Sequence, residues 1–309
     1  MSKVSIVMPL YNAEKYVSKA IESILEQTYQ DFELVIVNDA STDNSRQIVE
    51  KYKDKRIRVI DNTRNIGIAG TRNKGIELSK AEYIALLDDD DIAMPYRLEH
   101  EVKFLDEHKD IMVVGGHHRE IDEKGKDLEK KWLVYQNPNY IKAFLMLNNA
   151  VVNGSTMFRK SFVTKHNIAY RNDMCGAEDY LFWVECSLKG KIKNLDEVLL
   201  LWRRTENQQT TKILVKQIEK RNQVLDYIRH VAFEGNGYML NAEDYAIINK
   251  VFAEEAGIDS EEEINKIYWT LKKITEQAKE NDVDNKNEVI AMCRKRFGEK
   301  IGKAFFLWV

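Results

Sequence analysis

The 309-residue sequence contains few of the residues that cross-link a chain or break its helices. It has three cysteines, an odd number, and none shows C-x-x-C spacing. This pattern favours a reducing compartment and argues against a zinc site. It has three prolines, and none follows Pro138, so the long C-terminal stretch lacks the strongest helix breaker.

Long apolar runs and an excess of positive charge are also missing. No stretch approaches the roughly 18 apolar residues that a membrane-spanning helix requires, and no signal-peptide pattern precedes the strand-like run 4–8. We therefore expect a cytoplasmic protein. The formal net charge is −3 and no basic stripe alternates with aromatic residues, so nucleic acid is not an expected partner.

The common nucleotide-binding and hydrolase motifs are absent as well. The first strand-like run is not followed by G-x-G-x-x-G, and the sequence contains neither G-x-x-x-x-G-K-[ST] nor G-x-S-x-G. A nucleotide site in this chain would therefore have to work through carboxylates and a metal ion.

The first part of the chain alternates short apolar runs with amphipathic stretches, as βα units around a parallel sheet do. We predict strands buried on both faces at 4–8, 33–37, 57–60 and 83–87. Helical spacing of apolar residues predicts the helices between them, at 14–28, 43–53 and 66–79.

The rest of the chain changes from a mixed pattern to a helical one. After a strand at 111–115 we predict an exposed charged loop at 118–131, followed by alternating elements: a helix at 139–147, a strand at 155–158, a helix from Glu178 and a strand at 197–202. Apolar residues at helical spacing then continue to the end. We predict a catalytic domain over 1–210 and a helical C-terminal region over 211–309.

Four consecutive aspartates, Asp88 to Asp91, directly follow the apolar run 83–87. Adjacent carboxylates repel one another, so such a run at a strand end is favourable when a cation is bound. Oxygen ligands suit a hard divalent ion, and such ions in α/β enzymes often serve phosphates. The alternative is an acidic surface turn.

Other polar residues follow the remaining strands, at the sheet edge where open α/β sheets bind ligands. Asp39 either accepts a hydrogen bond from a base or ribose or caps the following helix. Arg72 either holds a diphosphate or lies on the surface. Glu178 and Asp179 either complement a helix dipole or supply a general base in an aromatic pocket.

Taken in order, several short motifs resemble glycosyltransferase family 2 over about residues 3–210. They are Met8-Pro9-Leu10-Tyr11-Asn12, Val37 through Asp43, Asn65-Ile66-Gly67 with Arg72-Asn73, Leu87 through Asp91, Met94-Pro95, Asn153-Gly154-Ser155, Glu178-Asp179 and Trp202-Arg203. The resemblance implies an α/β GT-A fold, a Rossmann-like mixed sheet flanked by helices. It also implies an inverting enzyme that uses a nucleotide-sugar, most similar to bacterial transferases that build lipooligosaccharide, capsule or other cell-surface glycans.

The same resemblance implies roles for individual residues. Pro9 and Tyr11 would shape a uracil pocket and Asp39 would contact the uracil. Asp88 and Asp90 match the family's D-x-D motif: Asp88 would face the ribose and join Asp90 at a divalent metal, Mn²⁺ or Mg²⁺. Asp179 matches the catalytic base, with Glu178 beside it, and Arg203 matches an arginine beside the diphosphate.

We add four residues to the predicted nucleotide-sugar site, Asn12, Asn65, Arg72 and Asp89, and we expect Asp91 to support the run. Two positions depart from the family pattern. Thr205 stands where a histidine is usual, so no histidine ligand is predicted, and Asn38-Asp39-Ala40-Ser41 replaces Asp-Asp-Gly-Ser, which leaves one carboxylate there.

These observations predict a glycosyltransferase that moves a hexosyl or N-acetylhexosaminyl group from a UDP-sugar to a glycan or lipid-linked glycan. A nucleotidyltransferase acting on a sugar phosphate is one alternative, although the loop 9–12 lacks the glycine-rich, basic character of such enzymes. A non-catalytic, metal-dependent glycan-binding module is the other.

The last segment, 294–309, is basic and ends in apolar residues. It either lies on an anionic membrane, at the inner face of the cell membrane, or packs on the chain's own helices or on a second subunit. The sequence therefore leaves peripheral membrane contact and homo-oligomer formation open.

Overall fold

The computed structural model describes residues 2–205, 217–252, 260–281 and 284–301. In this part of the chain a nine-stranded sheet has the order β3-β2-β1-β4-β8-β6-β9-β5, and β7 pairs with β6 outside that path. The strands are β1 (Val4–Leu10), β2 (Phe32–Asn38), β3 (Ile57–Asp61), β4 (Tyr83–Leu86), β5 (Ile92–Ala93), β6 (Ile111–Ile121), β7 (Asp127–Trp132), β8 (Met157–Arg159) and β9 (Lys191–Arg203).

Strands β1 to β4 form the parallel half of the sheet. Strand β1 pairs in parallel with β2 on one side and with β4 on the other, and β2 pairs in parallel with β3. The carboxyl ends of β1, β2 and β4 therefore meet at one edge. Strand β3 is the outer strand and is only half-buried, so the prediction of full burial for 57–60 is wrong, because β3 has a neighbour on one side alone.

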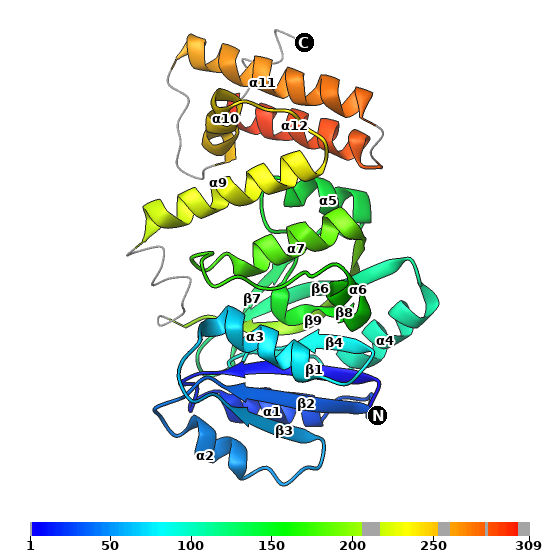
Figure 1. The fold of residues 1–309 in the computed structure, drawn as a ribbon, viewed down its shortest axis with the longest axis vertical. Helices are drawn as coiled ribbons and strands as arrows, with labels where there is room; N and C mark the ends of the chain where they lie inside the picture. Colours follow the sequence, from blue (N-terminus) through cyan, green and yellow to red (C-terminus); the bar gives the residue numbers. More distant parts are fainter. Residues whose placement is uncertain (1, 206–216, 253–259, 282–283, 302–309) are drawn as a thin grey trace.

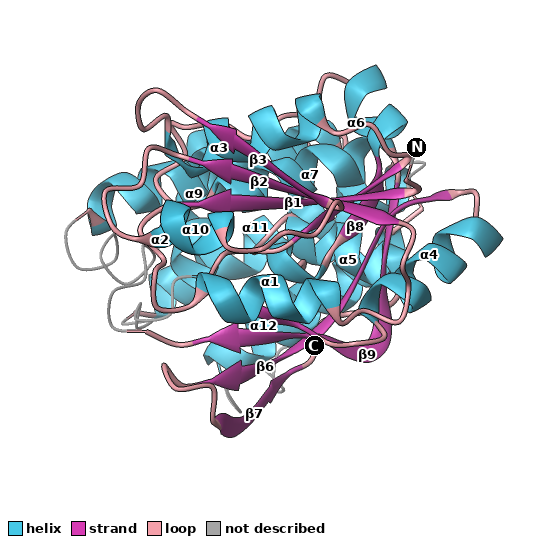
Figure 2. Cartoon of the chain, turned by 90° about the horizontal axis from the view of Figure 1, so that it is seen from below, coloured by secondary structure: helices cyan, strands magenta, loops and turns pink. Residues whose placement is uncertain are grey.

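Helices cover both faces of this half (Figure 2). On one face, helix α1 (Val17–Leu25) packs its apolar residues against Ile6 and Met8 of β1. On the other face, helix α3 (Gly67–Leu78) approaches β1 closely, because Gly75 has no side chain: a Cβ there would lie 2.4 Å from Val7 Cγ1. The predicted helices at 14–28, 43–53 and 66–79 are confirmed with shorter bounds, the second being α2 (Ser45–Glu50).

The region predicted as an exposed charged loop, 118–131, is a β-hairpin. Strand β6 runs on to Ile121 and pairs with β7, and Gly125 takes the positive φ of +88° in the turn between them. The charged side chains are tolerated because β7 is an edge strand whose residues are mostly exposed. The hairpin places Trp132, at the end of β7, beside the cavity that opens at the carboxyl ends of the parallel strands.

The remaining described helices are α4 (Arg97–Glu107), α5 (Pro138–Leu145), α6 (Lys160–Lys165), α7 (Glu178–Lys189), α9 (Ile218–Gly235), α10 (Ala242–Phe252), α11 (Glu261–Glu280) and α12 (Lys286–Ile301), with the short 3₁₀ helix η1 (Asn153–Ser155). Local sequence explains several boundaries. Helix α5 begins where the Asn137 side chain accepts a hydrogen bond from Asn139 N at 2.9 Å, with Pro138 at its first position. Helix α11 is capped by Ser260, whose Oγ accepts from Glu263 N.

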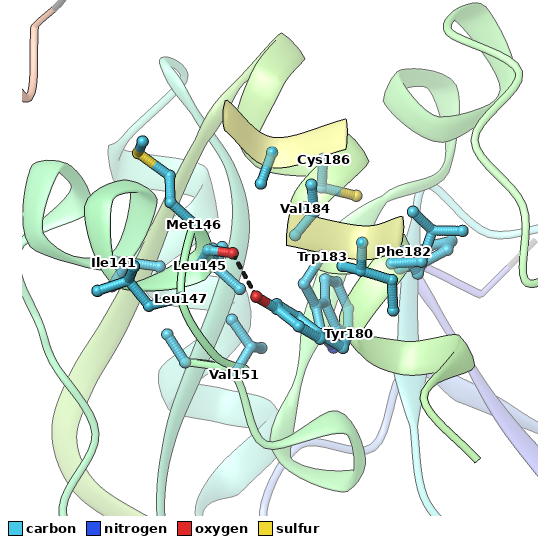
Figure 3. Close-up of a cluster of buried hydrophobic side chains, with 14 of the residues drawn as sticks. Ile141, Leu145, Met146, Leu147, Val151, Tyr180, Phe182, Trp183, Val184 and Cys186 are labelled. Carbon is cyan, nitrogen blue, oxygen red and sulfur yellow. Dashed lines mark hydrogen bonds between the residues drawn. The ribbon is translucent and has the colours of Figure 1, made fainter. Parts of the chain in front are cut away.

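The C-terminal helices α9 to α12 stack at the end of the molecule opposite strands β1 to β3 (Figure 1). They share one hydrophobic cluster with the preceding part of the chain, because Ile228 and Phe233 of α9 belong to the same cluster as Trp183 of α7. Figure 3 shows where α5 and α7 meet: Tyr180 Oη donates a hydrogen bond to Leu145 O at 2.8 Å within this apolar surround. The division at residue 210 stays a prediction, and the core continues across it.

Among the described residues, no helix combines the length and apolarity needed to cross a bilayer. Helix α12 includes the first part of the basic segment 294–309, while residues 302–309 lie outside the described residues.

Candidate active site

A cavity of about 980 Å³ opens at the carboxyl ends of β1, β2 and β4. Every predicted catalytic, nucleotide-sugar and metal residue except Arg203 lines it: Pro9, Tyr11, Asn12, Asp39, Asn65, Arg72, Asp88, Asp89, Asp90, Glu178 and Asp179. These residues come from separate segments of the chain. Their convergence follows from the parallel order of the strands and from the position of α7 across the same edge.

The loops after β1 and β2 are joined by side-chain hydrogen bonds. Asn12 adopts a positive φ of +52° and donates from its backbone N to Ser41 Oγ at 3.2 Å. Its side-chain Oδ1 accepts from Thr42 N at 2.8 Å. Ala40 also has a positive φ, +56°, which glycine adopts far more readily. One wall of the cavity is thus formed by two loops that hydrogen bonds hold together.

Asp39 anchors the beginning of α3. Its Oδ1 accepts from Asn62 Nδ2 and Ile66 N, both at 2.8 Å, and its Oδ2 accepts from Gly67 N at 2.9 Å. The helix it supports is therefore α3, whereas the sequence suggested the next helix, α2. Oδ2 holds one described donor and the residue lines the cavity, so the predicted contact with a base remains compatible with this role.

Arg72 is buried and joins two acidic elements, so the alternative of a surface residue is wrong. Its Nη2 donates to Asp88 Oδ1 at 2.8 Å and its Nη1 donates to Glu178 Oε1 at 3.1 Å. Burial lowers the pKa of Arg72, but Asp88 and Glu178 outweigh it and raise the pKa above its usual value. The guanidinium thereby fixes the spacing between the aspartate run and the start of α7.

The four aspartates have different partners. Asp89 accepts from Tyr11 N at 2.9 Å and Asp91 accepts from Arg203 N at 2.9 Å, while Asp88 pairs with Arg72. Among the described residues, no other residue donates a hydrogen bond to the Asp90 carboxylate. The run lines the cavity and its last member is buried, so it is not a surface turn.

The electrostatics of the run fit a divalent cation. Burial, with Asp88 nearby as the second cause, raises the pKa of Asp90 to about 6. Burial also raises the pKa values of Asp89 and Asp91, with Asp90 adding to both. In the described part of the chain no group of three His, Cys, Asp or Glu residues forms a closed metal site. Mg²⁺-type sites that serve phosphates use one or two carboxylates plus phosphate oxygens and water, and Asp88 and Asp90 would supply the carboxylates of such a site.

Asp179 lies in the first turn of α7 and its carboxylate is held on both oxygens. Tyr180 N donates to Oδ1 at 2.8 Å and Asn149 Nδ2 donates to Oδ2 at 3.0 Å. Burial raises its pKa to about 6, with Glu178 as the second cause, whereas Arg72 acts to lower it. A carboxylate fixed in direction and with raised proton affinity suits a general base near neutral pH.

Arg203 lies behind the aspartate run. Its guanidinium donates to Asp90 O at 2.7 Å and to Asp122 O at 3.0 Å, and it lies over the Tyr16 ring, 5.0 Å from the ring centre. Arg204 and Thr205 line the cavity beside it. The predicted contact of Arg203 with a diphosphate stays a prediction, and the contacts described here give this residue a positioning role.

Sequence reasoning missed several residues that complete the site. Asn149, which orients Asp179, gave no signal because it lies in a loop with no recognisable spacing. Arg97 is fully buried and donates to Leu86 O at 2.9 Å and to Gly154 O at 2.6 Å, which holds the strand end that carries the aspartates. His118, Glu120 and Trp132 line the cavity from the hairpin that was taken for a loop. The signal that could have found them is the turn sequence 122–126, which contains Gly125.

Comparison with known proteins gives a consistent result. The model of the family described as "Glycosyl transferase family 2" matches residues 5–175. An uncharacterized glycosyltransferase of Haemophilus influenzae is 31% identical over 245 residues, which cover 75% of this chain and 76% of that relative. The poly(ribitol-phosphate) β-N-acetylglucosaminyltransferase TarP of Staphylococcus aureus is 32% identical over 198 residues, covering 62% of this chain and 59% of TarP.

Two solved structures share the fold. S. aureus TarS 1–349 in complex with UDP-GlcNAc has a TM-score of 0.58 at 22% identity, covering 95% of this chain and 92% of that one. A mannosyltransferase from Pyrobaculum calidifontis in complex with GDP-Man and Mn²⁺ has a TM-score of 0.52 at 16% identity, covering 99% and 87%. The fold is therefore the GT-A fold of nucleotide-sugar-dependent transferases.

The chain belongs to glycosyltransferase family 2, and the protein is a glycosyltransferase.

Proposed function

We propose that the protein is an inverting glycosyltransferase that moves a hexosyl or N-acetylhexosaminyl group from a UDP-sugar to a hydroxyl of a surface glycan. The observation that carries this proposal is the arrangement around Arg72. This buried guanidinium joins Asp88 of the aspartate run to Glu178, the neighbour of Asp179, across one cavity. Groups for the leaving diphosphate and for the attacking hydroxyl are therefore held in one rigid unit.

The proposed reaction is a single displacement at the anomeric carbon. Asp179 accepts the proton of an acceptor hydroxyl while that oxygen attacks the face of the sugar opposite the diphosphate. The bond from the anomeric carbon to the phosphate oxygen breaks, the electron pair leaves with UDP, and the configuration at that carbon inverts. Asn149 and Tyr180 N hold both oxygens of Asp179, so the base is oriented before the acceptor arrives.

Asp88 and Asp90 would hold the divalent ion, which when bound supplies positive charge to the departing phosphate oxygens. The carboxylate of Asp90 is the group best suited to it, because burial and Asp88 raise its pKa to about 6 and a cation would favour its charged form. Asp91 and Arg203 support the run from the buried side.

UDP is favoured as the carrier because the TarS structures were obtained with UDP-GlcNAc and with UDP. The chain is compatible with a base pocket between the joined loops, where Tyr11 is 49% exposed and Asp39, whose Oδ2 accepts from Gly67 N, would contact the base. The name of TarP supports a bacterial surface glycan as the acceptor class. These observations favour sugar transfer over the nucleotidyltransferase and glycan-binding alternatives.

A donor screen tests the proposal. The purified protein is incubated with UDP- and GDP-linked hexoses and N-acetylhexosamines, with Mn²⁺ and with EDTA, and the release of nucleoside diphosphate is measured. We expect turnover of at least one UDP-sugar, at least ten times faster with Mn²⁺ than with EDTA. Turnover restricted to GDP-sugars would contradict the choice of UDP, and pyrophosphate released from a nucleoside triphosphate and a sugar phosphate would favour the nucleotidyltransferase.

A further inference from the structure

One side of the cavity is lined by aromatic residues that the proposed chemistry does not use. The hairpin strands β6 and β7, with β9, carry His118, Trp132 and Trp202 on the face that lines the cavity, and we call these three residues the aromatic face. The rings of His118 and Trp132 are nearly parallel, with centres 6.3 Å apart, and Trp202 meets His118 edge-on at 5.9 Å. The site therefore has an aromatic wall on the side formed by the hairpin, in which the rings of His118 and Trp132 are nearly parallel.

One ring of the aromatic face, that of Trp132, is open to solvent, while His118 and Trp202 are partly buried. Trp132 is 54% exposed, although an indole is among the most costly side chains to leave in water, and it belongs to neither of the two hydrophobic clusters. Trp132 also sits at the end of an edge strand, at the rim of the cavity. Packing within the described residues does not account for its position, so a ligand that covers the ring is the simpler explanation.

A buried carboxylate lies beside these rings. Glu120 is 2% exposed, and its Oε1 accepts from Trp132 Nε1 at 2.6 Å. Its Oε2 is buried and has no hydrogen-bond donor among the described residues, the nearest cation being Arg204 Nε at 3.6 Å. A buried carboxylate oxygen without a donor is costly, so a donor from a ligand in the cavity would stabilise it.

His118 offers a second unused polar atom. Its Nδ1 is buried and has no hydrogen-bond partner among the described residues. Burial lowers the pKa of His118 to about 4, so the ring is neutral at pH 7 and presents no charge to a ligand. The aromatic face thus combines flat rings with two neighbouring polar atoms, His118 Nδ1 and Glu120 Oε2, that have no hydrogen-bond partner among the described residues.

We propose that the aromatic face and Glu120 form an acceptor subsite for a neutral pyranose ring. The C–H bonds on one face of such a ring pack against the electron-rich face of an indole, and its hydroxyls donate to Glu120 Oε2 and bond to His118 Nδ1. A phosphate-bearing chain fits poorly, because the carboxylates of Glu120 and of the aspartate run repel it. This inference rests on the proposed function, because a bound glycan is an acceptor only if the protein transfers a sugar to it.

His118 and Trp132 are separated from most of the predicted donor residues. Those donor residues come mainly from the ends of β1, β2 and β4 and from α3, with Arg203 on β9 next to Trp202, whereas His118 and Trp132 come from β6 and β7. An exposed ring at the rim also suits a glycan that continues into solvent, while a donor sugar is transferred from within the cavity. Truncation of Trp132 should therefore weaken acceptor binding and leave nucleotide binding intact.

The test is an array of neutral hexose and N-acetylhexosamine oligosaccharides, with polyol-phosphate oligomers included, probed with the full-length protein in the absence of any donor. We expect wild type to bind at least one neutral oligosaccharide and Trp132→Ala to bind it at least tenfold more weakly. Trp269→Ala is the matched control, because Trp269 is 60% exposed on α11 and does not line the cavity. Glu120→Gln should also weaken binding about tenfold, with its thermal melt confirming that it folds.

Three results of the array would overturn the inference: wild type binding no neutral oligosaccharide, wild type binding only polyol-phosphate, or Trp132→Ala binding as tightly as wild type. UDP affinity is measured on the same proteins by calorimetry and should change less than twofold in Trp132→Ala. A tenfold loss of UDP affinity would place the ring in the donor site and would also overturn it. The array uses no donor, so failure of the donor screen leaves this result standing.

Discussion

At the scale of single residues, the site depends on carboxylates whose surroundings assign them different tasks. Asp88 is paired with a buried arginine, Asp89 and Asp91 accept backbone hydrogen bonds, and Asp90 is the member that we propose for a cation. Asp179 lies opposite them with both oxygens held. Identical side chains thus differ in function because burial and hydrogen bonding differ at each position.

The raised pKa of Asp179 predicts a pH dependence. A general base must be ionised, and burial first and Glu178 second raise the pKa of Asp179 to about 6. We therefore expect kcat to be nearly constant above pH 7 and to fall about tenfold per unit below pH 6. Steady-state rates from pH 4.5 to 8 at saturating donor measure this. An acidic limb near pH 4 would show that a carboxylate with an ordinary pKa acts instead.

The residue types of the site could be predicted from sequence, while their pairings could not. The aspartate run, Asp39 and Glu178-Asp179 follow apolar runs or begin a helix, which is visible in the order of residues. Arg72 bonds to both Asp88 and Glu178, and Glu178 lies 106 residues further along the chain. No local sequence pattern encodes such a contact. Asn149 and Arg97 were missed for the same reason, because each acts through a contact distant in the chain.

At the scale of elements, the strand-end loops carry the site and one of them holds backbone strain. Ala40 has a φ of +56°, a region that costs a non-glycine residue about 1–2 kcal/mol. Glycine loses about 0.5–1 kcal/mol more backbone entropy on folding, so we predict that Ala40→Gly raises the free energy of unfolding by about 0.5–1 kcal/mol.

Urea unfolding measures the effect of Ala40→Gly. The slope of the unfolding free energy against urea concentration should be the same as in wild type. Ala69→Gly is the control, because Ala69 is helical and buried in α3 and its loss should lower the free energy of unfolding by about 1 kcal/mol or more. A lower unfolding free energy for Ala40→Gly would show that the methyl group of Ala40 contributes more by packing than its backbone conformation costs.

Elements with strong periodicity were predicted well, and those with mixed character were not. Strands β1 to β4 and helices α1, α2 and α3 were recovered because their apolar residues recur at the expected period. Strands β1, β2 and β3 are longer than predicted, whereas β4 and the three helices are shorter. The β6–β7 hairpin was missed since an exposed edge strand can be almost entirely charged, as β7 is. Helix α4 was also missed, because its buried face includes Arg97 and Glu101 beside Leu98 and Leu105.

At the scale of the whole molecule, the C-terminal helices are part of the fold's main core. Arg229 Nε of α9 donates to Leu147 O at 3.0 Å, and Arg221 Nη1 donates to Gly176 O at 2.8 Å, two residues before Glu178. The helical region therefore supports the loop that presents the proposed base. Sequence pattern alone showed the helices but gave no information on where they dock.

This continuity predicts that a fragment of residues 1–205 does not fold independently. Its truncation would uncover apolar surface on α7 that α9 covers in the full chain and on α5 that α12 covers. We expect the fragment to lack a sharp thermal transition and to lose the near-ultraviolet circular dichroism of the full chain, which should unfold in one transition. A fragment that melts cooperatively with native-like spectra would instead support independent domains divided near residue 210.

The most direct test of the account compares Asp179→Asn with Asp173→Asn. Both change an aspartate near the start of α7, but Asp173 is exposed and pairs with Arg171 outside the cavity. General-base catalysis contributes about 10²–10⁴-fold, so we predict that Asp179→Asn lowers kcat at least 100-fold while its Kd for UDP stays within twofold of wild type. Asp173→Asn should keep wild-type values of both. Near-normal turnover by Asp179→Asn would contradict the assignment of the base and, with it, the proposed mechanism.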